Sequence, residues 1–454
     1  MSRRFGFPHP LTLMVACIVI AAALSWVLPA GRYERRDDPA TGRSVVVAGT
    51  YRAVPATPVS AFGAVVAIPK GLSDAASVVF FVFLVGGAFG VVDQTGALRE
   101  GVNWLARRLA THDLLVVPIT CIAFATAGAL EHMQEEIIAL VPALLLLVRR
   151  LGFDELTAAA MSIGAAAVGA AFSPIDPFQA QIAQKLAQLP LLSGAGFRLV
   201  FLALALLVWI WGTMRHARRA RRAPMELPAA ADDPAAASDA AGTRQGIVLA
   251  LVLASFAVFV YGVLRLGWDF DQMAALFFAM GVAAGLVGGL GVTGTALAFV
   301  EGFRAMAFAA LLIGFARAIF VVLRDGSIID TIVHGVFTPI AGLPLALAAI
   351  GMLVVQAVVH VPVPSVSGQA VLTMPLLVPL SDLLGLSRQV MVLTYQYGAG
   401  LCELLTPTNG ALMAILAAYG VRYDRWLRFV LPLYLALVGL GVAAVLLGIA
   451  IGLR

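Results

Sequence analysis

Two groups of polar residues interrupt a chain that is otherwise strongly apolar, and each group contains a proline. Their hydroxyl, amide and carboxylate oxygens are groups that coordinate cations or hydrogen-bond a small polar solute. Carboxylates inside apolar segments are costly and usually serve a function. The candidate substrate- or ion-binding residues are Gln134, Glu135, Glu136, Ser173, Asp176, Gln179, Ser365, Ser367, Gly368, Thr406, Thr408 and Asn409.

The carboxylates of this set could bind a cation in more than one way. Asp176 could coordinate a metal cation or pair with a cationic substrate. Glu135 and Glu136 could do the same or carry a proton. We predict coupling to sodium or to protons, and no organic cofactor. The candidate sodium site combines Ser173, Asp176, Thr406 and Asn409.

Other polar residues within the apolar segments have alternative interpretations. His132 and His360 are typical of helix ends, so they are not counted as ligands. Glu136 could face a solvated vestibule, and Glu403 is a further site candidate because it precedes the second proline break. Arg317 could extend to a membrane interface, or it could face a cavity as the partner of a carboxylate.

The composition indicates a membrane protein. Of the 454 residues, 61% are hydrophobic and 12% are charged, whereas soluble domains average roughly 25% charged residues. A soluble chain could not hide so much apolar surface, so lipid must solvate part of it. The formal net charge of +5 comes with arginines at the ends of apolar runs. Their position is typical of topology signals, and no aromatic platform accompanies them, so we expect no nucleic-acid binding.

Apolar segments occur along the whole chain, separated by polar stretches. A spanning helix needs roughly 20 apolar residues, so the shorter segments cannot span. The segments lie at about 11–29, 75–93, 114–130, 137–148, 155–190, 197–214, 245–264, 272–290, 305–323, 343–361, 369–380, 389–418 and 429–452.

Two short segments, 114–130 and 137–148, predict a re-entrant hairpin. The polar tip 131–136 separates them, and arginine pairs flank both outer ends. Because arginine flanks favour the cytoplasm, both ends are expected on one side of the membrane. The next segment, 155–190, contains two prolines that bracket Asp176. Proline removes a backbone donor and clashes with the preceding turn, so two half-helices with an unwound joint are predicted.

The second half of the chain repeats this plan. Pro142 and Pro375 are 233 residues apart (375 − 142), and the same spacing relates Asp176 to Asn409. Counting spans from a cytoplasmic N-terminus makes the second repeat run opposite to the first. The predicted fold is therefore an all-α integral membrane protein with inverted repeats, two re-entrant hairpins and two broken helices.

This topology predicts five parts of the chain. One of them is a flexible linker, predicted where the sequence becomes rich in Ala, Asp and Pro. The parts are the first transmembrane helix with an external loop at 1–74, the first repeat at 75–214, a cytoplasmic linker at 215–244, two connecting transmembrane helices at 245–304, and the second inverted repeat at 305–454.

Inverted repeats with paired broken helices are the pattern of secondary transporters. A broken helix presents N–H groups that favour anions at one half-helix end and C=O groups that favour cations at the other. We expect a symporter or exchanger of a small carboxylate-bearing metabolite. A membrane-embedded enzyme is less expected because HExxH, GxSxG and Cys/His clusters are absent from the sequence. A channel is the third class, and saturation at carrier rates would separate it from a carrier.

Several motifs resemble those of the YfcC/DcuC-type carriers, the C4-dicarboxylate anaerobic carrier family of the ion transporter superfamily. The resemblance covers most of the chain from about Leu11 to the end and is most specific in the C-terminal third. The motifs include Gly86-Gly87-Ala88-Phe89-Gly90, Glu135-Glu136, Ser173-Pro174-Ile175-Asp176-Pro177-Phe178, Ser367-Gly368-Gln369-Ala370 and Thr406-Pro407-Thr408-Asn409-Gly410.

The resemblance implies a hairpin-containing transporter of dicarboxylates or amino acids, often a homodimer, in the bacterial inner membrane. Some relatives are linked to arginine and ornithine. The family pattern has asparagine where Asp176 stands and a shorter tip than 131–136. The extra negative charge favours a cationic or zwitterionic substrate, so a basic amino acid antiporter is the alternative function. The implied partners are a small-molecule substrate, the lipid bilayer and a second copy of the chain.

Overall fold

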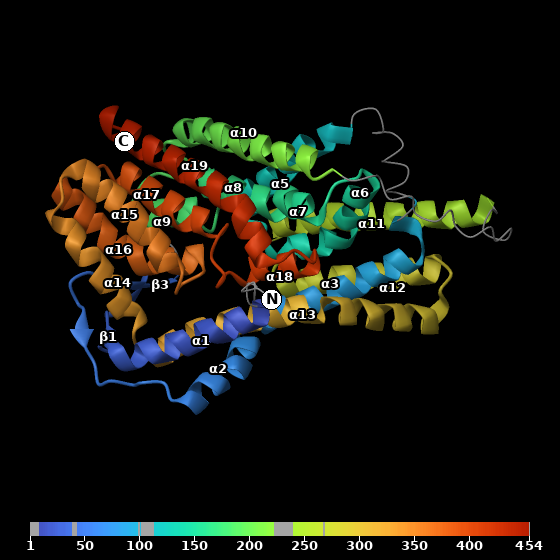
Figure 1. Cartoon of the computed structure of the whole chain (residues 1–454), viewed down its shortest axis with the longest axis horizontal. Coiled ribbons are helices and arrows are strands. Elements are labelled where there is room, and N and C mark those ends of the chain that lie inside the picture. The colour runs from blue at the N-terminus through green and yellow to red at the C-terminus, as the bar shows by residue number, and fades with distance from the viewer. Residues whose placement is uncertain are drawn as a thin grey trace, which may run out of the picture.

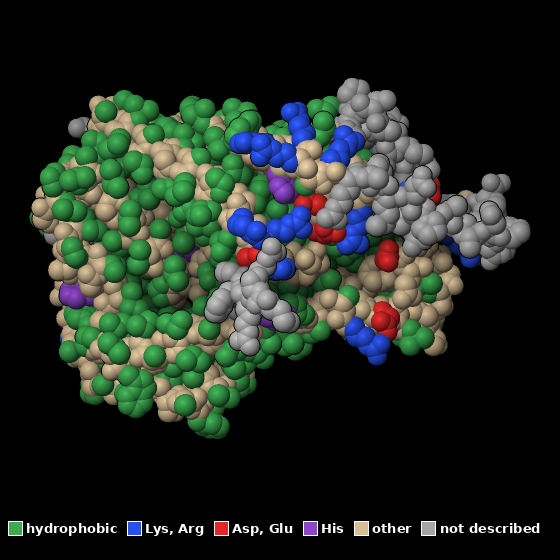
Figure 2. Space-filling model, in the orientation of Figure 1, with side chains coloured by type: hydrophobic (Ala, Val, Ile, Leu, Met, Phe, Trp, Pro, Cys, Tyr) green, Lys and Arg blue, Asp and Glu red, His purple; other side chains and the backbone are tan. Residues whose placement is uncertain are grey.

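The computed structural model describes residues 9–38, 43–98, 100, 113–221, 239–266 and 268–453. The predicted helical membrane fold is confirmed, since eight helices in this part of the chain are long and apolar enough to cross a membrane. Figure 2 shows hydrophobic side chains over most of the visible face, with Lys and Arg gathered over one part of it. An apolar outer surface of this kind is what contact with lipid requires.

The chain begins with the spanning helix α1 (Pro10–Val27). The external loop predicted to follow it contains four short strands and the helix α2 (Ala61–Asp74), none of which the sequence predicts. The strands pair antiparallel as β1 with β4 and β2 with β3. They are β1 (Gly31–Arg32), β2 (Arg35–Asp38), β3 (Arg43–Val46) and β4 (Arg52–Ala53).

Two helical legs flank the tip at 131–136, where the sequence predicts the first hairpin, and its re-entrant character stays a prediction. After α3 (Ala76–Gln94) and the short η1 (Asp113–Leu115), its first leg is α5 (Val116–Glu131). The leg ends at His132, whose backbone is left-handed with φ of 53°. The second leg consists of η2 (Glu135–Leu140) and α6 (Val141–Arg150).

The first broken helix is confirmed. It begins with α7 (Glu155–Ala159), passes through the π-helical turn η3 (Ala160–Gly164) and ends with α8 (Ala165–Phe172). The helix stops directly before the Ser173-Pro174 pair, because proline cannot continue the hydrogen-bond ladder. It resumes as α9 (Ala180–Leu186), and α10 (Ala195–Arg219) follows. In the wide turn η3, the carbonyl of Ala160 accepts a hydrogen bond from the indole N–H of Trp209 at 2.9 Å.

The predicted linker is shorter than 215–244, because both of its ends are helical. α10 continues to Arg219, and α11 (Asp239–Leu266) begins before the predicted end of the linker. The middle of the linker, 222–238, lies outside the described residues. α12 (Phe270–Val287) follows, and then α13 (Gly291–Asp325) runs for 35 residues. The predicted division at 304/305 therefore falls inside one continuous helix.

The second half repeats the hairpin and the broken helix. α15 ends at its hairpin tip, and α16 leads away from it. α17 and α18 form the second broken helix, with the break at 403–409. The elements are α14 (Ile329–Phe337), η4 (Thr338–Gly342), α15 (Leu345–His360), α16 (Val366–Leu384), α17 (Arg388–Cys402), α18 (Gly410–Ala418) and α19 (Tyr423–Ala450).

The repeat seen in the sequence has a structural counterpart. Gly152 and Gly385, which share the 233-residue spacing, both adopt a left-handed backbone, with φ of 78° and 69°. The residues that follow two positions later, Asp154 and Ser387, cap the N-termini of the two broken helices. In each half the first hairpin leg packs on the broken helix, α5 on α8 and α15 on α17.

The helices form two bodies (Figure 1). α13 lies along α1, α2 and α3, and α12 packs on α3, so these helices form one wall. α3 and α13 approach each other closely at Gly302, where an added Cβ would lie 2.4 Å from the carbonyl oxygen of Gly86. The hairpins and broken helices, with α10 and α19, form the other body.

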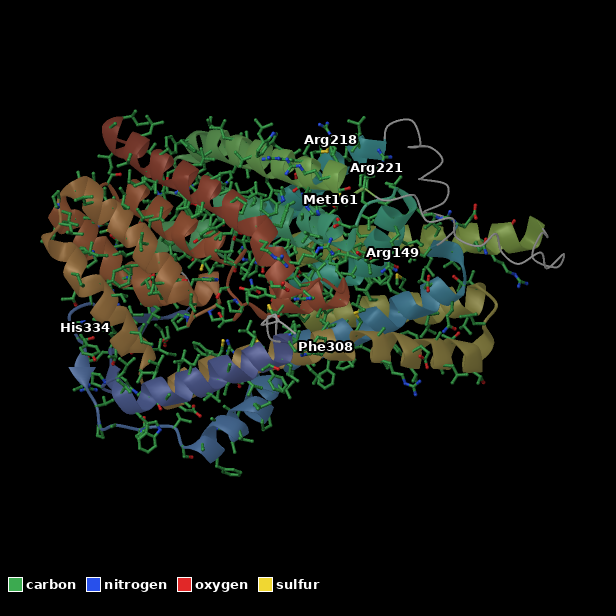
Figure 3. The ribbon with its side chains drawn as sticks, viewed as in Figure 1. Arg149, Met161, Arg218, Arg221, Phe308 and His334 are labelled. Atoms are coloured by element: carbon green, nitrogen blue, oxygen red, sulfur yellow. The ribbon has the colours of Figure 1, made fainter. Side chains whose placement is uncertain are left out.

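Several basic side chains at the ends of helices lie close together. Figure 3 shows Arg149, Arg218 and Arg221 near one another, whereas His334 lies far from them at one end of the long direction. Arg149 lies in the last turn of α6, and Arg218 lies in the last turn of α10. This arrangement agrees with the topology in which these helix ends face the cytoplasm.

Asp154 binds several groups close to these arginines. Its Oδ1 accepts a hydrogen bond from the backbone N–H of Thr157, and its Oδ2 lies 3.1 Å from His216 Nε2 and 2.5 Å from Arg425 Nη2. Burial raises the pKa of this carboxyl, but the hydrogen bonds from His216 and Thr157 outweigh burial and lower the pKa to about 2.

We expect Asp154→Asn to destabilise the protein by about 2 kcal/mol, because a buried, hydrogen-bonded charge is lost. The stabilisation should be fully present above the ordinary pKa of 3.8 and should disappear as pH falls through about 2, since the folded-state pKa is lowered. Thermal unfolding in detergent measures the change. The control is Asp382→Asn, which removes an exposed pair with Arg388 and should cost at most about 1 kcal/mol. Equal losses in both variants would contradict this account.

Candidate functional site

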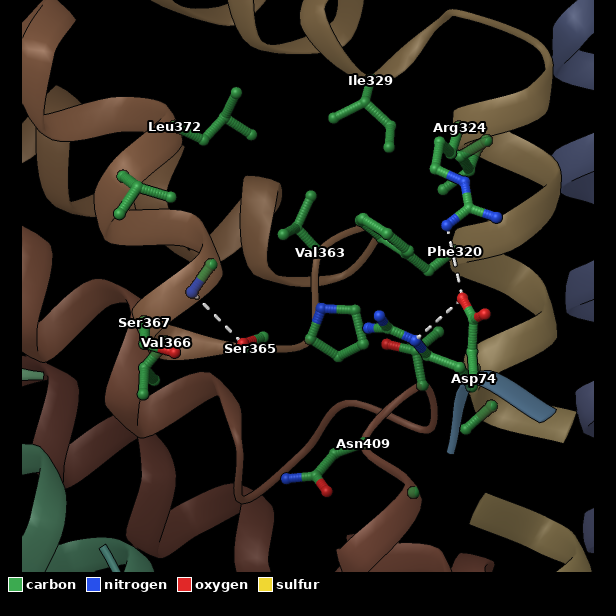
Figure 4. A pocket seen from close by; sticks show the side chains of 18 of the residues that line it. Asp74, Phe320, Arg324, Ile329, Val363, Ser365, Val366, Ser367, Leu372 and Asn409 are labelled. Atoms are coloured by element: carbon green, nitrogen blue, oxygen red, sulfur yellow. Dashed lines mark hydrogen bonds and ion pairs between the residues drawn. The ribbon is translucent and has the colours of Figure 1, made fainter. Parts of the chain in front are cut away.

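A cavity of about 890 Å³ lies between the two bodies. One side is formed by the hairpin tips and the second helix break, and the other by α13, the end of α2 and the loop strands. Figure 4 shows Ser365 and Asn409 on the first side and Asp74, Phe320 and Arg324 on the other. The two tips therefore meet at one cavity, as the repeat predicts.

Four titratable side chains form a chain beside this cavity, which we call the tip cluster: Asp176, His132, Glu403 and His360. His132 Nδ1 lies 2.6 Å from Asp176 Oδ2, and His132 Nε2 lies 3.3 Å from Glu403 Oε2. His360 Nε2 lies 3.9 Å from Glu403 Oε1. The cluster thus joins both hairpin tips and both helix breaks.

Gln134 connects the first tip to the second break. Its Nε2 donates a hydrogen bond to Glu403 and lies 3.1 Å from His132 Nε2. Its Oε1 accepts a hydrogen bond from Asn409 Nδ2 at 3.1 Å. The amide therefore holds the two halves of the chain together at the cavity wall.

Asp176 is enclosed rather than open to the cavity. Its Oδ1 accepts hydrogen bonds from the backbone N–H groups of Phe178 and Gln179 at 2.8 and 2.7 Å, and its Oδ2 faces His132. Ser173 is enclosed too, because its hydroxyl donates to the carbonyl of Ala129 and accepts from the N–H of Asp176. Both side chains stabilise the conformation of the break and bind it to the first hairpin.

A buried arginine lies behind the first break, at a position that is not among the predicted site residues. Arg198 is fully buried and donates hydrogen bonds to the side-chain oxygens of Gln396 and Gln389 and to the carbonyl of Ser193. Gln396 in turn donates to the carbonyl of Ser173 at 2.6 Å. Gln179, a predicted site residue, also bonds this region through the carbonyl of Gln396. These residues position the break rather than face the cavity.

We expect Arg198→Lys to destabilise the protein by roughly 2 kcal/mol or more, because a lysine cannot reproduce the planar fork that bonds both glutamines. Thermal unfolding in detergent checks this. Arg304→Lys is the matched control, since Arg304 is exposed and pairs only with the exposed Glu301 among its described partners. If both variants unfold at the wild-type temperature, the buried arginine does not stabilise the break.

The polar residues of the second half cap two helices that begin at the cavity. Ser365 Oγ accepts from the N–H of Gly368 at the start of α16, and Asn409 Oδ1 accepts from the N–H of Leu412 at the start of α18. Thr408 donates to the carbonyl of Val361 and contacts Thr406 at 2.9 Å. Helix N-termini favour negative charge, so this part of the wall suits a carboxylate.

The predicted site residues fall into two sets. Seven line the cavity: Gln134, Glu135, Ser365, Ser367, Gly368, Thr408 and Asn409. The other five support the wall from behind it: Glu136, Ser173, Asp176, Gln179 and Thr406. Glu136, for instance, accepts a hydrogen bond from the backbone N–H of Gln134.

The four residues of the candidate sodium site each have protein partners. Ser173 bonds Asp176, and Asn409 bonds Gln134. Thr406 contacts Thr408. The site that would combine all four stays a prediction.

Three residues in or beside the cavity wall contribute more to the site than the sequence indicates. His132 and His360 do end their helices, as expected, but their rings also contact the buried carboxylates. Glu403 lies beside the second break and touches both histidines. The signal in the sequence is that the first leg of each hairpin ends in a histidine.

The opposite wall carries the positive charge. Arg324 Nη1 lies 3.3 Å from Asp74 Oδ2 (Figure 4). Arg317 Nε lies 3.7 Å from the same oxygen, and the Arg317 guanidinium lies over the ring of Phe320. Arg317 lines the cavity, so of its two interpretations the structure supports a cavity-facing arginine that pairs with a carboxylate.

A comparison with models of protein families shows which family the chain belongs to. A family model described as "C4-dicarboxylate anaerobic carrier", DcuC, matches residues 7–450. The chain belongs to this family. It is a transporter and not an enzyme, and it is a multi-pass protein of the bacterial inner membrane.

Curated relatives resemble this carrier over nearly their whole length. "Putative basic amino acid antiporter YfcC" of Escherichia coli is 32% identical, over 94% of this chain and 93% of the relative. An uncharacterised protein of Haemophilus influenzae is 28% identical, over 95% of both chains. Among solved structures, the YdaH transporter of Alcanivorax borkumensis is similar with a TM-score of 0.44 and 18% identity, covering 98% of this chain and 99% of that one.

Proposed function

We propose that the chain is a secondary carrier that exchanges small basic amino acids such as arginine and ornithine across the membrane. The observation that carries this proposal is the charge pattern of the cavity: Glu135 and Glu403 line the same wall as the starts of α16 and α18. The carboxylates suit a cationic side chain, and the helix N-termini suit the substrate carboxylate. The printed name of the Escherichia coli relative supports the same substrate class.

A C4-dicarboxylate is the second candidate, and the family description favours it. The helix N-termini and the wall of Arg317 and Arg324 would suit its two carboxylates. However, Glu135 and Glu403 would repel a second negative charge. Of the arginines that line the cavity, Arg317 and Arg324 already pair with Asp74, and Arg35 pairs with Asp330. The cavity therefore fits a zwitterion with an extra positive charge better than a dianion.

Counterflow in proteoliposomes tests the proposal. Vesicles loaded with unlabelled arginine or succinate are diluted into the same labelled compound, with and without a sodium gradient. Labelled arginine should accumulate transiently, and ornithine should compete with its uptake. Labelled succinate should not accumulate. Succinate counterflow without arginine counterflow would favour a C4-dicarboxylate carrier over a carrier of basic amino acids. A dependence on sodium would support the predicted sodium site. If neither compound shows counterflow, the result contradicts the proposal that the chain carries small carboxylate-bearing metabolites.

A further inference from the structure

The arginines that line the cavity differ in their partners. Arg35, Arg317 and Arg324 each pair with a carboxylate. Arg32 instead donates a hydrogen bond from Nη2 to the hydroxyl of Ser327 at 2.9 Å, and Ser327 also lines the cavity. Among the described residues, Arg32 pairs with no carboxylate. Its positive charge is therefore available to a solute in the cavity.

The backbone around Arg32 directs its side chain toward the cavity. Side chains of a strand alternate between its two faces, and Arg32 is exposed whereas Gly31 and Tyr33 are buried. The N–H of Gly31 donates to the carbonyl of Ser327 at 3.0 Å. The N–H of Tyr33 donates to Asp330 Oδ2 at 2.9 Å. Both bonds attach β1 to the junction between α13 and α14, so Arg32 is held beside the cavity.

Further contacts fasten the loop that contains the four strands. The rings of Tyr51 and His334 stack with their centroids 4.1 Å apart, and the hydroxyl of Tyr51 lies 2.9 Å from Thr331 Oγ1. The hydroxyl of Tyr33 lies 3.0 Å from His334 Nδ1. β1 packs on α14, and β3 packs on α16, which leads away from the second hairpin tip (Figure 1). The loop therefore contacts both bodies at one end of the cavity and holds Arg32 in a fixed place.

The charge of Arg32 does not stabilise the loop. In the pairing of β1 with β4, Arg32 lies opposite Arg52, and like charges opposite each other destabilise a sheet. The carboxylates closest to Arg32 and Ser327 in the sequence already pair with other cations. The pairs are Glu34 with Arg52, Asp325 with Lys70, and Asp330 with Arg35. A charge that destabilises its strand and has no carboxylate partner in the described part of the chain indicates a role in binding.

We propose that Arg32 and Ser327 form a subsite that binds the carboxylate of an amino acid substrate at the loop end of the cavity. The planar guanidinium group matches the two oxygens of a carboxylate, and such charge-assisted hydrogen bonds are the strong ones. The hydrogen bond to Ser327 involves only Nη2, so the other nitrogens of Arg32 can donate to the substrate. This inference rests on the proposed function, which supplies the amino acid.

The subsite is distinct from the carboxylate site of the proposed function. That site is at the starts of α16 and α18, whereas Arg32 belongs to the wall formed by α13 and the loop. Arg32 binds the carboxylate first, while the amino acid passes the loop, and the helix N-termini bind it afterwards. A group that binds substrate before it reaches the inner site increases uptake at low concentration and leaves the rate at saturation unchanged. Arg32 should therefore affect KM and not the maximal rate.

The test is the concentration dependence of labelled arginine uptake into arginine-loaded proteoliposomes. We expect Arg32→Gln to raise KM about tenfold, because hydrogen bonds to a charged group are lost, and to leave the maximal rate within about twofold of wild type. Arg36→Gln is the matched control, since Arg36 is an exposed arginine of β2 outside the lining of the cavity, and its KM should not change.

The outcomes separate this inference from the proposed function. A wild-type KM in Arg32→Gln, or an equal rise in both variants, would overturn the subsite and leave the proposed function standing. Absence of arginine counterflow in the wild-type protein would overturn both. If Arg32→Gln does not fold, Arg32→Lys takes its place, because lysine keeps the charge and loses the planar fork. A KM equal to that of Arg36→Lys would then overturn the subsite.

A second probe tests whether Arg32 recognises the carboxylate itself. Agmatine has the guanidinium group of arginine and lacks the carboxylate. Its inhibition constant against labelled arginine uptake should be the same for the wild type and Arg32→Gln, whereas the inhibition constant of unlabelled arginine should rise about tenfold. An equal rise for both compounds would overturn the assignment of a carboxylate to this subsite.

Discussion

Glu403→Gln is expected to reduce arginine counterflow by about 30-fold or more. The substitution keeps the shape of the side chain and removes the negative charge that His132 and His360 face and that a cationic substrate would meet. Loss of one partner from a buried charge pair costs roughly 2 kcal/mol or more, which corresponds to a factor of about 30 in rate. The measurement is the initial rate of labelled arginine uptake into arginine-loaded proteoliposomes.

The control for this result is Glu301→Gln. Glu301 lies on the exposed surface of α13, where it pairs with Arg304, so the same chemical change should leave uptake within about twofold of wild type. Size-exclusion profiles of both variants must match the wild type. Wild-type uptake in a correctly folded Glu403→Gln protein would remove Glu403 from the site.

Gly128→Ala is expected to destabilise the protein strongly, although it adds only one methyl group. An added Cβ would lie 2.1 Å from the carbonyl oxygen and 2.7 Å from the carbonyl carbon of Ala166, which are backbone atoms of α8. Backbone cannot move aside as a side chain can, so α5 must separate from α8. Overpacking of this kind costs roughly 1–3 kcal/mol or more, and the apparent unfolding temperature in detergent should fall by several degrees.

Gly439→Ala is the matched comparison for this variant. Gly439 is exposed on α19, and an added Cβ would meet no atom within 4 Å. The same substitution should be neutral there or stabilise the helix by roughly 0.5–1 kcal/mol, because alanine loses less backbone entropy than glycine. If the two variants unfold at the same temperature, α5 and α8 do not depend on this close approach.

Helix breaks were the features most easily predicted from the sequence, because proline acts locally. Ser173-Pro174 and Thr406-Pro407 stop their helices wherever the rest of the chain lies. The spacing of 233 residues between the halves was equally informative, since Gly152 and Gly385 adopt the same left-handed backbone.

Other elements could not be predicted from local signals. α2 lies in a segment that contains Gly63, Pro69 and Gly71, residues that disfavour a helix, and packing against α13 overrides that preference. α13 extends through Glu301 and Arg304, whose charges suggested a boundary between apolar segments.

Sequence patterns indicate which polar side chains could form a site, but not what each of them contacts. Residue type showed that Asp176 carries a costly charge, but not that backbone N–H groups and His132 already satisfy it. Conversely, Glu403 and His132 are far apart in the sequence, and only the folded chain brings them to 3.3 Å. Contacts between the halves depend on tertiary packing that no local pattern specifies.

The wide turn at Ala160–Gly164 has a consequence for how this chain tolerates insertions and deletions. A π-helical turn accommodates one residue more than an α-helical turn, so a deletion there would leave a regular helix. Every residue beyond it would rotate by about 100° about the helix axis, and the first break would turn away from the second. The turn therefore sets the angular register of the first break, and its length is under tighter constraint than its side chains.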